Sequence, residues 1–250
     1  KQNCIFVVME VELKNIEIED AQLDLVKEQL SLYLKSFDNI DKKDKDLNIV
    51  SLFSGCGGMD LGFEGGFKVH RKAISKETYE NFIEKSIDKN YLELKLTRFK
   101  TVFANDILKD ARNTWVHNFS KNNYKPEVFH TESIVNLVKL HEQGLNVFPK
   151  KVDIVTGGFP CQDFSVAGKR NGFNSHRKHD GKLINGDLPT EESRGKLYYW
   201  MKRVVEITEP KIFIAENVKG LVNLSDVKEI IQKDFASANG NGYLVLDPQV

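Results

Sequence analysis

Residues 49 to 60 read Ile49-Val50-Ser51-Leu52-Phe53-Ser54-Gly55-Cys56-Gly57-Gly58-Met59-Asp60. A short apolar run rich in β-forming residues ends here in a glycine-rich turn. Glycines at a strand-to-helix turn let the backbone approach a ligand closely and direct amide groups toward it. A turn with a purely structural role is an equally good interpretation of this stretch taken alone. The stretch therefore predicts the first strand and helix of an α/β domain, with a bound nucleotide cofactor as one of two interpretations.

Further apolar runs follow along the chain, at residues 101–104, 152–156 and 212–215. Amphipathic stretches lie between them, for example at residues 109–119 and 196–208. Near-continuous apolar strands that alternate with helices are typical of a mostly parallel sheet covered by helices on both faces. The sequence predicts that α/β fold, in which ligands bind beyond the carboxyl ends of the strands.

Two segments fall outside this alternation. Residues 1–46 are expected to form an N-terminal extension with a short strand at residues 7–14, an amphipathic helix at residues 23–37 and a charged linker. Packing against its own domain is the simpler interpretation of that helix, and binding a partner or a second copy is the alternative. Residues 68–100 are charged and are expected to be a partly helical insertion.

The composition narrows the class of protein. The chain has 36 basic and 36 acidic side chains, so its formal net charge is zero. Contact with nucleic acid must then come from a local basic patch rather than from the field of the whole chain. Three cysteines cannot build a disulfide framework, and neither a membrane span nor a signal peptide is evident. These features indicate a reducing compartment, the cytoplasm.

The second informative stretch follows the run at residues 152–156 and reads Gly157-Gly158-Phe159-Pro160-Cys161-Gln162. A cysteine at the end of a strand, reached through two glycines and a proline, is placed as a nucleophile would be. Most free cysteines are buried structural thiols. Basic residues follow Cys161 within a few positions, however, and favour an exposed and reactive thiolate. We interpret Cys161 as a nucleophile.

Two carboxylates each follow the end of an apolar run. Glu216 follows the run at residues 212–215, where partial desolvation is expected to raise its pKa. A salt-bridged strand end is the ordinary interpretation of a lone glutamate, but beside Cys161 it suits covalent catalysis with acid assistance. Asp106 is placed to accept hydrogen bonds from both ribose hydroxyls of a cofactor. The chain has no Gly-Lys-Ser or Gly-Lys-Thr phosphate loop, which argues against ATP or GTP hydrolysis and leaves NAD open at this end.

Four motifs occur in one order along the chain: Phe53-Ser54-Gly55-Cys56-Gly57-Gly58, Gly158-Phe159-Pro160-Cys161-Gln162, Arg194-Gly195-Lys196-Leu197 and Glu216-Asn217-Val218. Together they closely resemble the DNA cytosine-5 methyltransferase family over about residues 48–221. The resemblance implies a Rossmann-like catalytic domain at residues 47–250. It would bind S-adenosyl-L-methionine, release S-adenosyl-L-homocysteine and need no metal.

The resemblance also implies roles for single residues. Cys161 would add to a flipped-out cytosine, Glu216 would stabilise or protonate its ring, and Asn217 would hold Glu216, with Gln162 completing the catalytic set. Ser133-Ile134 stands where the family usually has Asp-Ile, and Asp106 where it often has Glu. The implied cofactor-binding residues are Phe53 against the adenine, Asp106 at the ribose, and Gly55, Cys56, Gly57, Gly58, Ile107, Ser133, Ile134, Pro160 and Leu197.

A glycine-containing basic loop follows the nucleophile. It supplies the local basic patch that DNA binding requires in a chain with zero net charge. We expect it to close on the phosphates of double-stranded DNA. His176 and His179 are interpreted as loop residues rather than metal ligands, because no second cluster completes a metal site. The expected DNA-contacting residues are Ser165, Lys169, Arg170, Arg177, Lys178 and Lys182.

Elements that the family places later are not found in this chain: a Gln-x-Arg-x-Arg motif, a target-recognition domain and a C-terminal helix. We therefore expect either a fragment or one subunit of a split enzyme, with the rest supplied by a missing C-terminal region or a second polypeptide. The leading hypothesis is the modification enzyme of a bacterial restriction-modification system, acting in the cytoplasm. An RNA (tRNA) cytosine-5 methyltransferase and a non-catalytic subunit that binds a cofactor or DNA are the alternatives.

Overall fold

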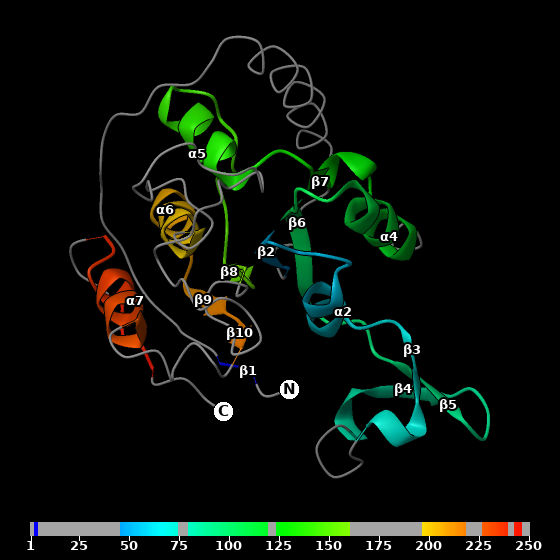
Figure 1. The fold of residues 1–250 in the computed structure, drawn as a ribbon. Coiled ribbons are helices and arrows are strands. Elements are labelled where there is room, and N and C mark those ends of the chain that lie inside the picture. The colour runs from blue at the N-terminus through cyan, green and yellow to red at the C-terminus, as the bar shows by residue number, and fades with distance from the viewer. Residues whose placement is uncertain are drawn as a thin grey trace.

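The structure, a computed structural model, describes residues 3–4, 46–74, 80–119, 124–160, 197–218, 227–239 and 243–246. Its centre is a five-stranded sheet with the strand order β7-β6-β2-β8-β9 (Figure 1). Every pairing in this sheet is parallel. The strands are β2 (Leu47–Leu52), β6 (Phe99–Asn105), β7 (Phe129–His130), β8 (Ile154–Gly157) and β9 (Ile212–Ala215). The predicted parallel α/β fold is confirmed.

The strand order determines where a ligand can bind. Numbered along the chain, the parallel strands lie in the order 3-2-1-4-5, which is the doubly wound arrangement of a Rossmann-like domain. The chain moves outward in one direction from β2 through β6 to β7, then returns to place β8 on the other side of β2. The connection that follows β2 therefore leads toward β6, and the connection that follows β8 leads the opposite way, toward β9. A crevice forms at that switch point, beyond the carboxyl ends of the two strands.

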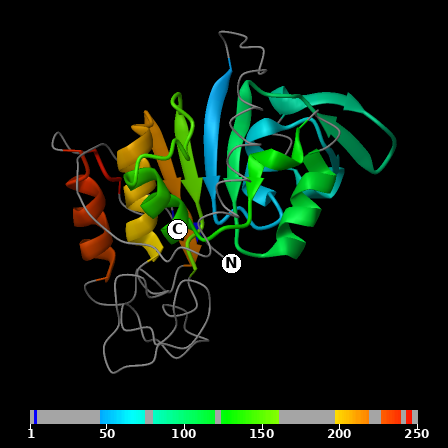
Figure 2. The same cartoon turned by 90° about the horizontal axis from the view of Figure 1, so that it is seen from above.

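Helices cover both sides of the sheet (Figure 2). α2 (Gly58–Glu64) and α4 (Lys109–Phe119) belong to one side, where Trp115 and Phe119 pack in a small aromatic cluster. α5 (Ile134–Glu142), α6 (Leu197–Thr208) and α7 (Val227–Ala236) contribute to the larger core on the other side. The sheet is thus buried on both faces, as near-continuous apolar strands require.

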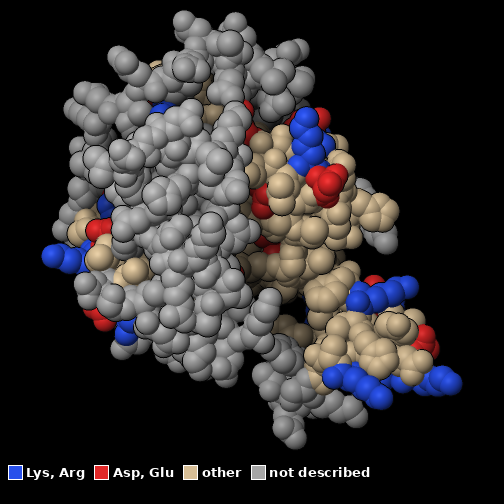
Figure 3. Space-filling model, viewed as in Figure 1, with Lys and Arg blue, Asp and Glu red and all other residues tan. Residues whose placement is uncertain are grey.

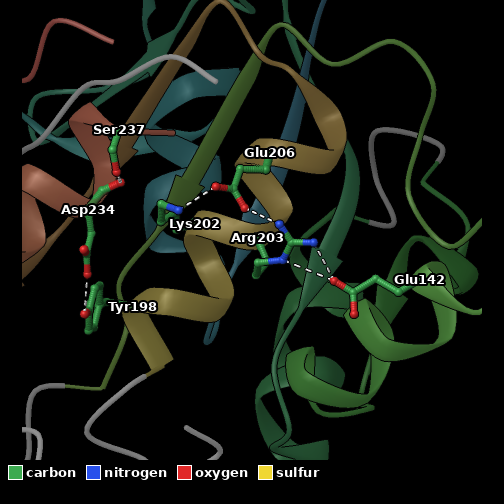
Figure 4. A network of polar contacts seen from close by, with 7 residues as sticks. All are labelled: Glu142, Tyr198, Lys202, Arg203, Glu206, Asp234 and Ser237. Atoms are coloured by element: carbon green, nitrogen blue, oxygen red, sulfur yellow. Dashed lines mark hydrogen bonds and ion pairs between the residues drawn. The ribbon is translucent and has the colours of Figure 1, made fainter. Parts of the chain in front are cut away.

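Polar contacts fasten α6 to its two neighbouring helices (Figure 4). The Arg203 guanidinium donates from Nη2 to Glu142 Oε1 of α5 at 2.6 Å and also pairs with Glu206 on its own helix. Tyr198 donates its hydroxyl to Asp234 Oδ2 of α7 at 2.6 Å. Buried cations with carboxylate partners hold the helices in one relative position, because breaking such a pair leaves an unpaired charge in the core.

Residues 68–94 contain a second sheet, which is antiparallel. Its order is β3-β5-β4, from β3 (Lys68–His70), β4 (Ile83–Ser86) and β5 (Tyr91–Leu94). The sequence predicted a partly helical insertion at residues 68–100. The described helical parts are two short 3-10 segments, most of the other described residues form strands, and residues 99–100 belong to β6. In β5, Leu92 is buried between exposed or half-buried neighbours, so the local period is that of a strand. Lys and Arg side chains lie around this sheet (Figure 3).

The N-terminal extension is described only at β1 (Asn3–Cys4), which pairs antiparallel with β10 (Asn217–Val218). Figure 1 shows these two short strands side by side. The strand expected at residues 7–14 and the helix expected at residues 23–37 lie outside the described residues. The chain start is therefore joined to the segment that directly follows Glu216. Within the described ranges, no helix is both long and apolar enough to cross a membrane.

Candidate cofactor and catalytic site

A cavity of about 500 Å³ lies at the switch point, beyond the ends of β2 and β8. It brings together Phe53, the residue expected to stack on a cofactor base, and Glu216, the expected acid. The full lining is Ser51, Leu52, Phe53, Ser54, Met59, Thr156, Gly157, Gly158 and Glu216. The sheet topology thus places the motifs of Phe53 and Glu216, which are far apart in sequence, in the walls of one cavity.

The turn after β2 is held in place by hydrogen bonds to β6. Ser54 N donates to Asn105 O at 2.9 Å, and Gly57 N donates to Ser54 O at 2.9 Å within the turn. Phe53, which begins the turn, has φ of 52°, in the left-handed region. That conformation is an outlier for a bulky residue and adds roughly 1–3 kcal/mol of strain, of a kind that clusters at ligand sites. Phe53 is therefore oriented by the turn rather than by the strand.

Asp106 ties the glycine turn to the start of α4. Its Oδ2 accepts from Gly55 N at 3.0 Å and its Oδ1 accepts from Leu108 N at 2.9 Å. A carboxylate has further lone pairs on both oxygens, so these contacts leave it able to accept from ribose hydroxyls. Next to it, Ile107 and Leu108 are 45% and 61% exposed. The loop therefore presents a carboxylate beside uncovered apolar surface, which suits a nucleoside.

Glu216 is fitted closely against the end of β8. Its backbone N–H donates to Gly157 O at 2.9 Å, and a Cβ placed on Gly158 would lie 2.9 Å from Glu216 Oε2. A side chain at position 158 would therefore displace this carboxyl from its present position. Burial raises the pKa of Glu216, which confirms the direction expected from its position at a strand end. A carboxyl with a raised pKa keeps its proton to higher pH and can donate it.

Asn217 links the Glu216 segment to the chain that leads into Cys161. Its Nδ2 donates to Phe159 O at 3.0 Å, its Oδ1 accepts from Val218 N at 2.9 Å, and the side chain is buried. Only Pro160, which is half-buried, separates Phe159 from the cysteine. A carbonyl held this way fixes the direction in which the chain leaves β8.

The comparisons with known proteins agree with this geometry. The family model described as C-5 cytosine-specific DNA methylase matches residues 47–246. The chain belongs to this family. The resemblance drawn from the four motifs is therefore confirmed.

Curated relatives of this methylase family are Type II methyltransferases. M.BsuRI of Bacillus subtilis is 31% identical over 245 residues, covering 92% of this chain and 46% of the relative. M.BspRI of Lysinibacillus sphaericus is 31% identical over 223 residues, covering 84% and 41%. M.Sau96I of Staphylococcus aureus is 32% identical over 197 residues, covering 78% and 33%. The chain thus spans less than half the length of these relatives.

Not all of the residues expected from the methylase family line the cavity. Ser133 is the N-cap of α5, where its Oγ accepts from Val135 N at 3.3 Å. Ile134 and Leu197 are buried in the larger core. A serine hydroxyl used as a helix cap satisfies a backbone donor that would otherwise be unpaired, a role that aspartate fills equally well. Gly55, Cys56, Gly57, Gly58, Asp106, Ile107 and Pro160 lie outside the lining, in the turn, the loop after β6 and the segment after β8.

Several other predicted residues lie outside the described part of the chain, and their roles stay predictions. This set includes the nucleophile, the neighbouring glutamine and the basic loop, namely Cys161, Gln162, Ser165, Lys169, Arg170, Arg177, Lys178 and Lys182. The third family motif is described only at its last residue, Leu197. Among the residues that the structure describes, no group of three or more His, Cys, Asp or Glu side chains could hold a metal ion.

Of the nine residues that line the cavity, seven were not among the predicted site residues: Ser51, Leu52, Ser54, Met59, Thr156, Gly157 and Gly158. Ser51 and Thr156 are opposite each other in the pairing of β2 with β8. Both are hydroxyl residues near the carboxyl ends of otherwise apolar strands. The sequence shows that pattern. It does not show that the two residues line the same cavity, because that requires β2 and β8 to be neighbours.

Proposed function

We propose that this chain is the catalytic part of a DNA cytosine-5 methyltransferase that modifies DNA in a restriction-modification system. The observation that carries the proposal is the single cavity shared by Phe53 and Glu216, at the switch point of a chain that belongs to the C-5 methylase family. The reaction is transfer of a methyl group from S-adenosyl-L-methionine to carbon 5 of a flipped-out cytosine. Relatives named as Type II methyltransferases support the restriction-modification role.

The residues around the turn fit S-adenosyl-L-methionine. A Cβ on Gly55 or Gly58 would meet no atom within 4 Å, so the space beside this part of the turn is open to a ligand. Phe53 would stack on the adenine, Asp106 would accept from the ribose, and Ile107 would cover apolar surface of the base. When bound, this cofactor supplies an electrophilic methyl group.

The proposed mechanism starts from the electronic problem of the substrate. Carbon 5 of cytosine is too weak a nucleophile to take a methyl group unaided. The Cys161 thiolate forms a bond to carbon 6, and the displaced electron pair makes carbon 5 nucleophilic. Glu216, whose pKa is raised by burial, donates a proton to ring nitrogen 3, which limits the developing charge, and takes it back when the ring is restored. After methyl transfer, a base removes the carbon 5 proton, the ring double bond reforms and the Cys161 thiolate leaves.

DNA binding requires both a basic surface and a means of reaching the base. Ring atoms are inaccessible inside a duplex, so the target cytosine must be flipped out. We assign phosphate contacts to the basic loop at residues 165–182. Residues 47–250 form the catalytic domain in this proposal, and residues 1–46 an extension. Because the chain spans less than half of its relatives, the remaining family region, on the same or another polypeptide, is proposed to choose the target sequence.

Covalent trapping on DNA that contains 5-fluorocytosine tests the proposal. Fluorine at carbon 5 cannot leave as a proton does, so the cysteine adduct accumulates. The protein for this test is the chain fused to the C-terminal part of the Bacillus subtilis relative, with a labelled methyl donor. We expect an adduct with duplex DNA that Cys161→Ser abolishes and that Glu216→Gln slows by about 100-fold. An adduct that survives Cys161→Ser would refute the assignment of the nucleophile.

A substrate panel separates the alternative activities. The same fusion is given duplex DNA, single-stranded DNA and transfer RNA with the labelled methyl donor. Label in duplex DNA supports the proposal, and label in transfer RNA alone would move the chain to the RNA-directed branch. Label in neither substrate, together with binding of the cofactor, would indicate a non-catalytic subunit.

A further inference from the structure

The glycine turn is in contact with the aromatic side chains of α4. Gly57 has φ of 84°, and a Cβ placed on it would lie 2.6 Å from Trp115 Cδ1 and 2.7 Å from Phe119 Cε2. The two rings are fully buried and stacked, with their centroids 4.2 Å apart. The backbone at Gly57 therefore rests against a rigid aromatic surface, and the position of that surface determines the position of the turn.

The orientation of the Trp115 ring is set by a buried carboxyl. Trp115 Nε1 donates to Asp60 Oδ2 at 2.6 Å, and Asp60 is 1% exposed. Asp60 is on the first turn of α2, next to Met59, which lines the cavity. Its other oxygen, Oδ1, makes no hydrogen bond of standard geometry among the described residues, and Ser51 is its other polar neighbour. Burying a carboxyl to this degree costs free energy, and the hydrogen bond from the indole offsets part of that cost.

A second carboxyl on α2 provides an internal comparison. Glu64 lies one helical turn beyond Asp60, where its Oε1 accepts from Thr101 N at 2.9 Å and from Tyr124 Oη at 2.7 Å. Tyr124 packs edge-on against Trp115, with centroids 5.7 Å apart. Both carboxyls thus bind the same aromatic cluster. Of the two carboxyls, only Asp60 accepts a hydrogen bond from Trp115, one of the two rings that contact the glycine turn.

We infer that Asp60 and Trp115 are positioning residues for the cofactor turn, and that they hold residues 55–58 in the binding geometry before the cofactor arrives. The inference rests on the proposed cofactor, S-adenosyl-L-methionine. Neither side chain lines the cavity, so both act through the backbone of the turn. A turn that is already ordered loses less conformational entropy on binding, and the benefit appears as affinity. The chemical step should not depend on either residue.

The test compares two variants that each remove one hydrogen-bond donor from the same cluster. Trp115→Phe removes the donor to Asp60, and Tyr124→Phe removes the donor to Glu64 one turn away. Affinity for S-adenosyl-L-homocysteine is measured by calorimetry, and hydrogen exchange of residues 53–61 is followed by mass spectrometry without ligand. We expect Trp115→Phe to weaken binding about tenfold and to speed exchange in the turn. Tyr124→Phe should change the affinity by less than about twofold, even where it lowers the melting temperature similarly.

A conservative variant of Asp60 separates the effect of its hydrogen bond, which positions Trp115, from the effect of its charge. Asp60→Asn keeps an oxygen that can accept from the indole and should retain most of the affinity, whereas Asp60→Leu should behave as Trp115→Phe does. In the active fusion, Trp115→Phe should raise KM for the methyl donor about tenfold and leave kcat within about twofold.

Equal losses of affinity in Trp115→Phe and Tyr124→Phe would overturn the inference, because general loss of stability would then explain both. An unchanged affinity and an unchanged turn exchange in Trp115→Phe would also overturn it. Failure of the unmodified chain to bind S-adenosyl-L-homocysteine would count against the proposed cofactor instead. In that event the exchange comparison still decides whether Trp115 fixes the turn.

Discussion

Gly55 and Gly57 have positive φ, 53° and 84°, but different surroundings. A side chain on Gly55 would meet nothing within 4 Å, whereas one on Gly57 would overlap the ring of Trp115. Gly55→Ala should therefore lower the free energy of unfolding by about 1 kcal/mol, the strain of a left-handed alanine. Gly57→Ala should lower it by about 3 kcal/mol, because overpacking of the core adds to that strain. Urea unfolding of both variants measures the difference, and equal losses would contradict the contact with Trp115.

Asp60 should make stability depend on pH. Burial raises its pKa from 3.8 to about 6, so its contribution to stability is fully present below 3.8 and is lost as the pH rises through about 6. At about 1.4 kcal/mol for each pH unit between the two values, the loss is about 3 kcal/mol. Asp60→Asn cannot ionise and should lack this decrease.

Chemical unfolding at several pH values between 4 and 7 checks the Asp60 prediction. The quantity of interest is the difference in unfolding free energy between the unmodified chain and Asp60→Asn at each pH. Glu64, whose pKa is also raised, remains in both proteins, so its own contribution cancels apart from its Coulombic interaction with Asp60. Parallel curves would show that Asp60 does not titrate in this range.

Among the helices, α6 carries ionised side chains into the interior. Glu206 accepts from Lys202 Nζ at 2.6 Å and pairs with Arg203, and all three residues are buried (Figure 4). Glu206→Gln would remove the carboxylate partner of Lys202 and leave Arg203 paired with Glu142 alone. We expect a loss of about 3–5 kcal/mol in the free energy of unfolding.

An exposed pair on the small sheet is the control for Glu206. Lys85 Nζ lies 3.0 Å from Glu93 Oε2, and the Lys85 side chain is 65% exposed. Lys85→Gln should change the free energy of unfolding by less than about 1 kcal/mol, because water screens the pair. Urea unfolding of both variants is the measurement. A loss in Glu206→Gln as small as that in Lys85→Gln would show that the α6 network does not stabilise the fold.

The elements were predicted best where their periodicity is strong. The apolar run at residues 212–215 is β9, and the amphipathic stretch at residues 109–119 is α4, each with the expected bounds. β2 ends at Leu52, one residue earlier than expected, because Phe53 turns into the left-handed region. The strands at residues 68–94 were missed, because each has only three or four residues and contains charged side chains.

At the scale of the whole molecule, the short length of the chain relative to its relatives should limit methyl transfer by the chain alone. The chain covers 46% of M.BsuRI, and we propose that the part of the family outside this match selects the target sequence. We expect the chain alone to incorporate less than about one hundredth of the methyl label that its fusion to the C-terminal part of that relative incorporates. The reason is that flipping a base costs unpairing and unstacking energy, which DNA contacts made by the remaining family region would offset.

Methyl transfer to duplex DNA, measured with labelled donor at equal protein concentrations, tests this prediction. The fusion carrying Cys161→Ser serves as the control for label that is bound but not transferred. Efficient, sequence-specific methylation by the chain alone would contradict the prediction.

The sequence by itself determined the alternation of strands and helices, the methylase family and the residues proposed for the reaction. Periodicity and short motifs are local features, and they persist whatever the rest of the chain does. Only the tertiary structure decided that Phe53 and Glu216 line one cavity, and that Asp60 meets Trp115 across 55 residues of sequence. Both facts depend on which strands are neighbours and which helices share a face. Those choices are made by burial of the whole core, which no single segment encodes.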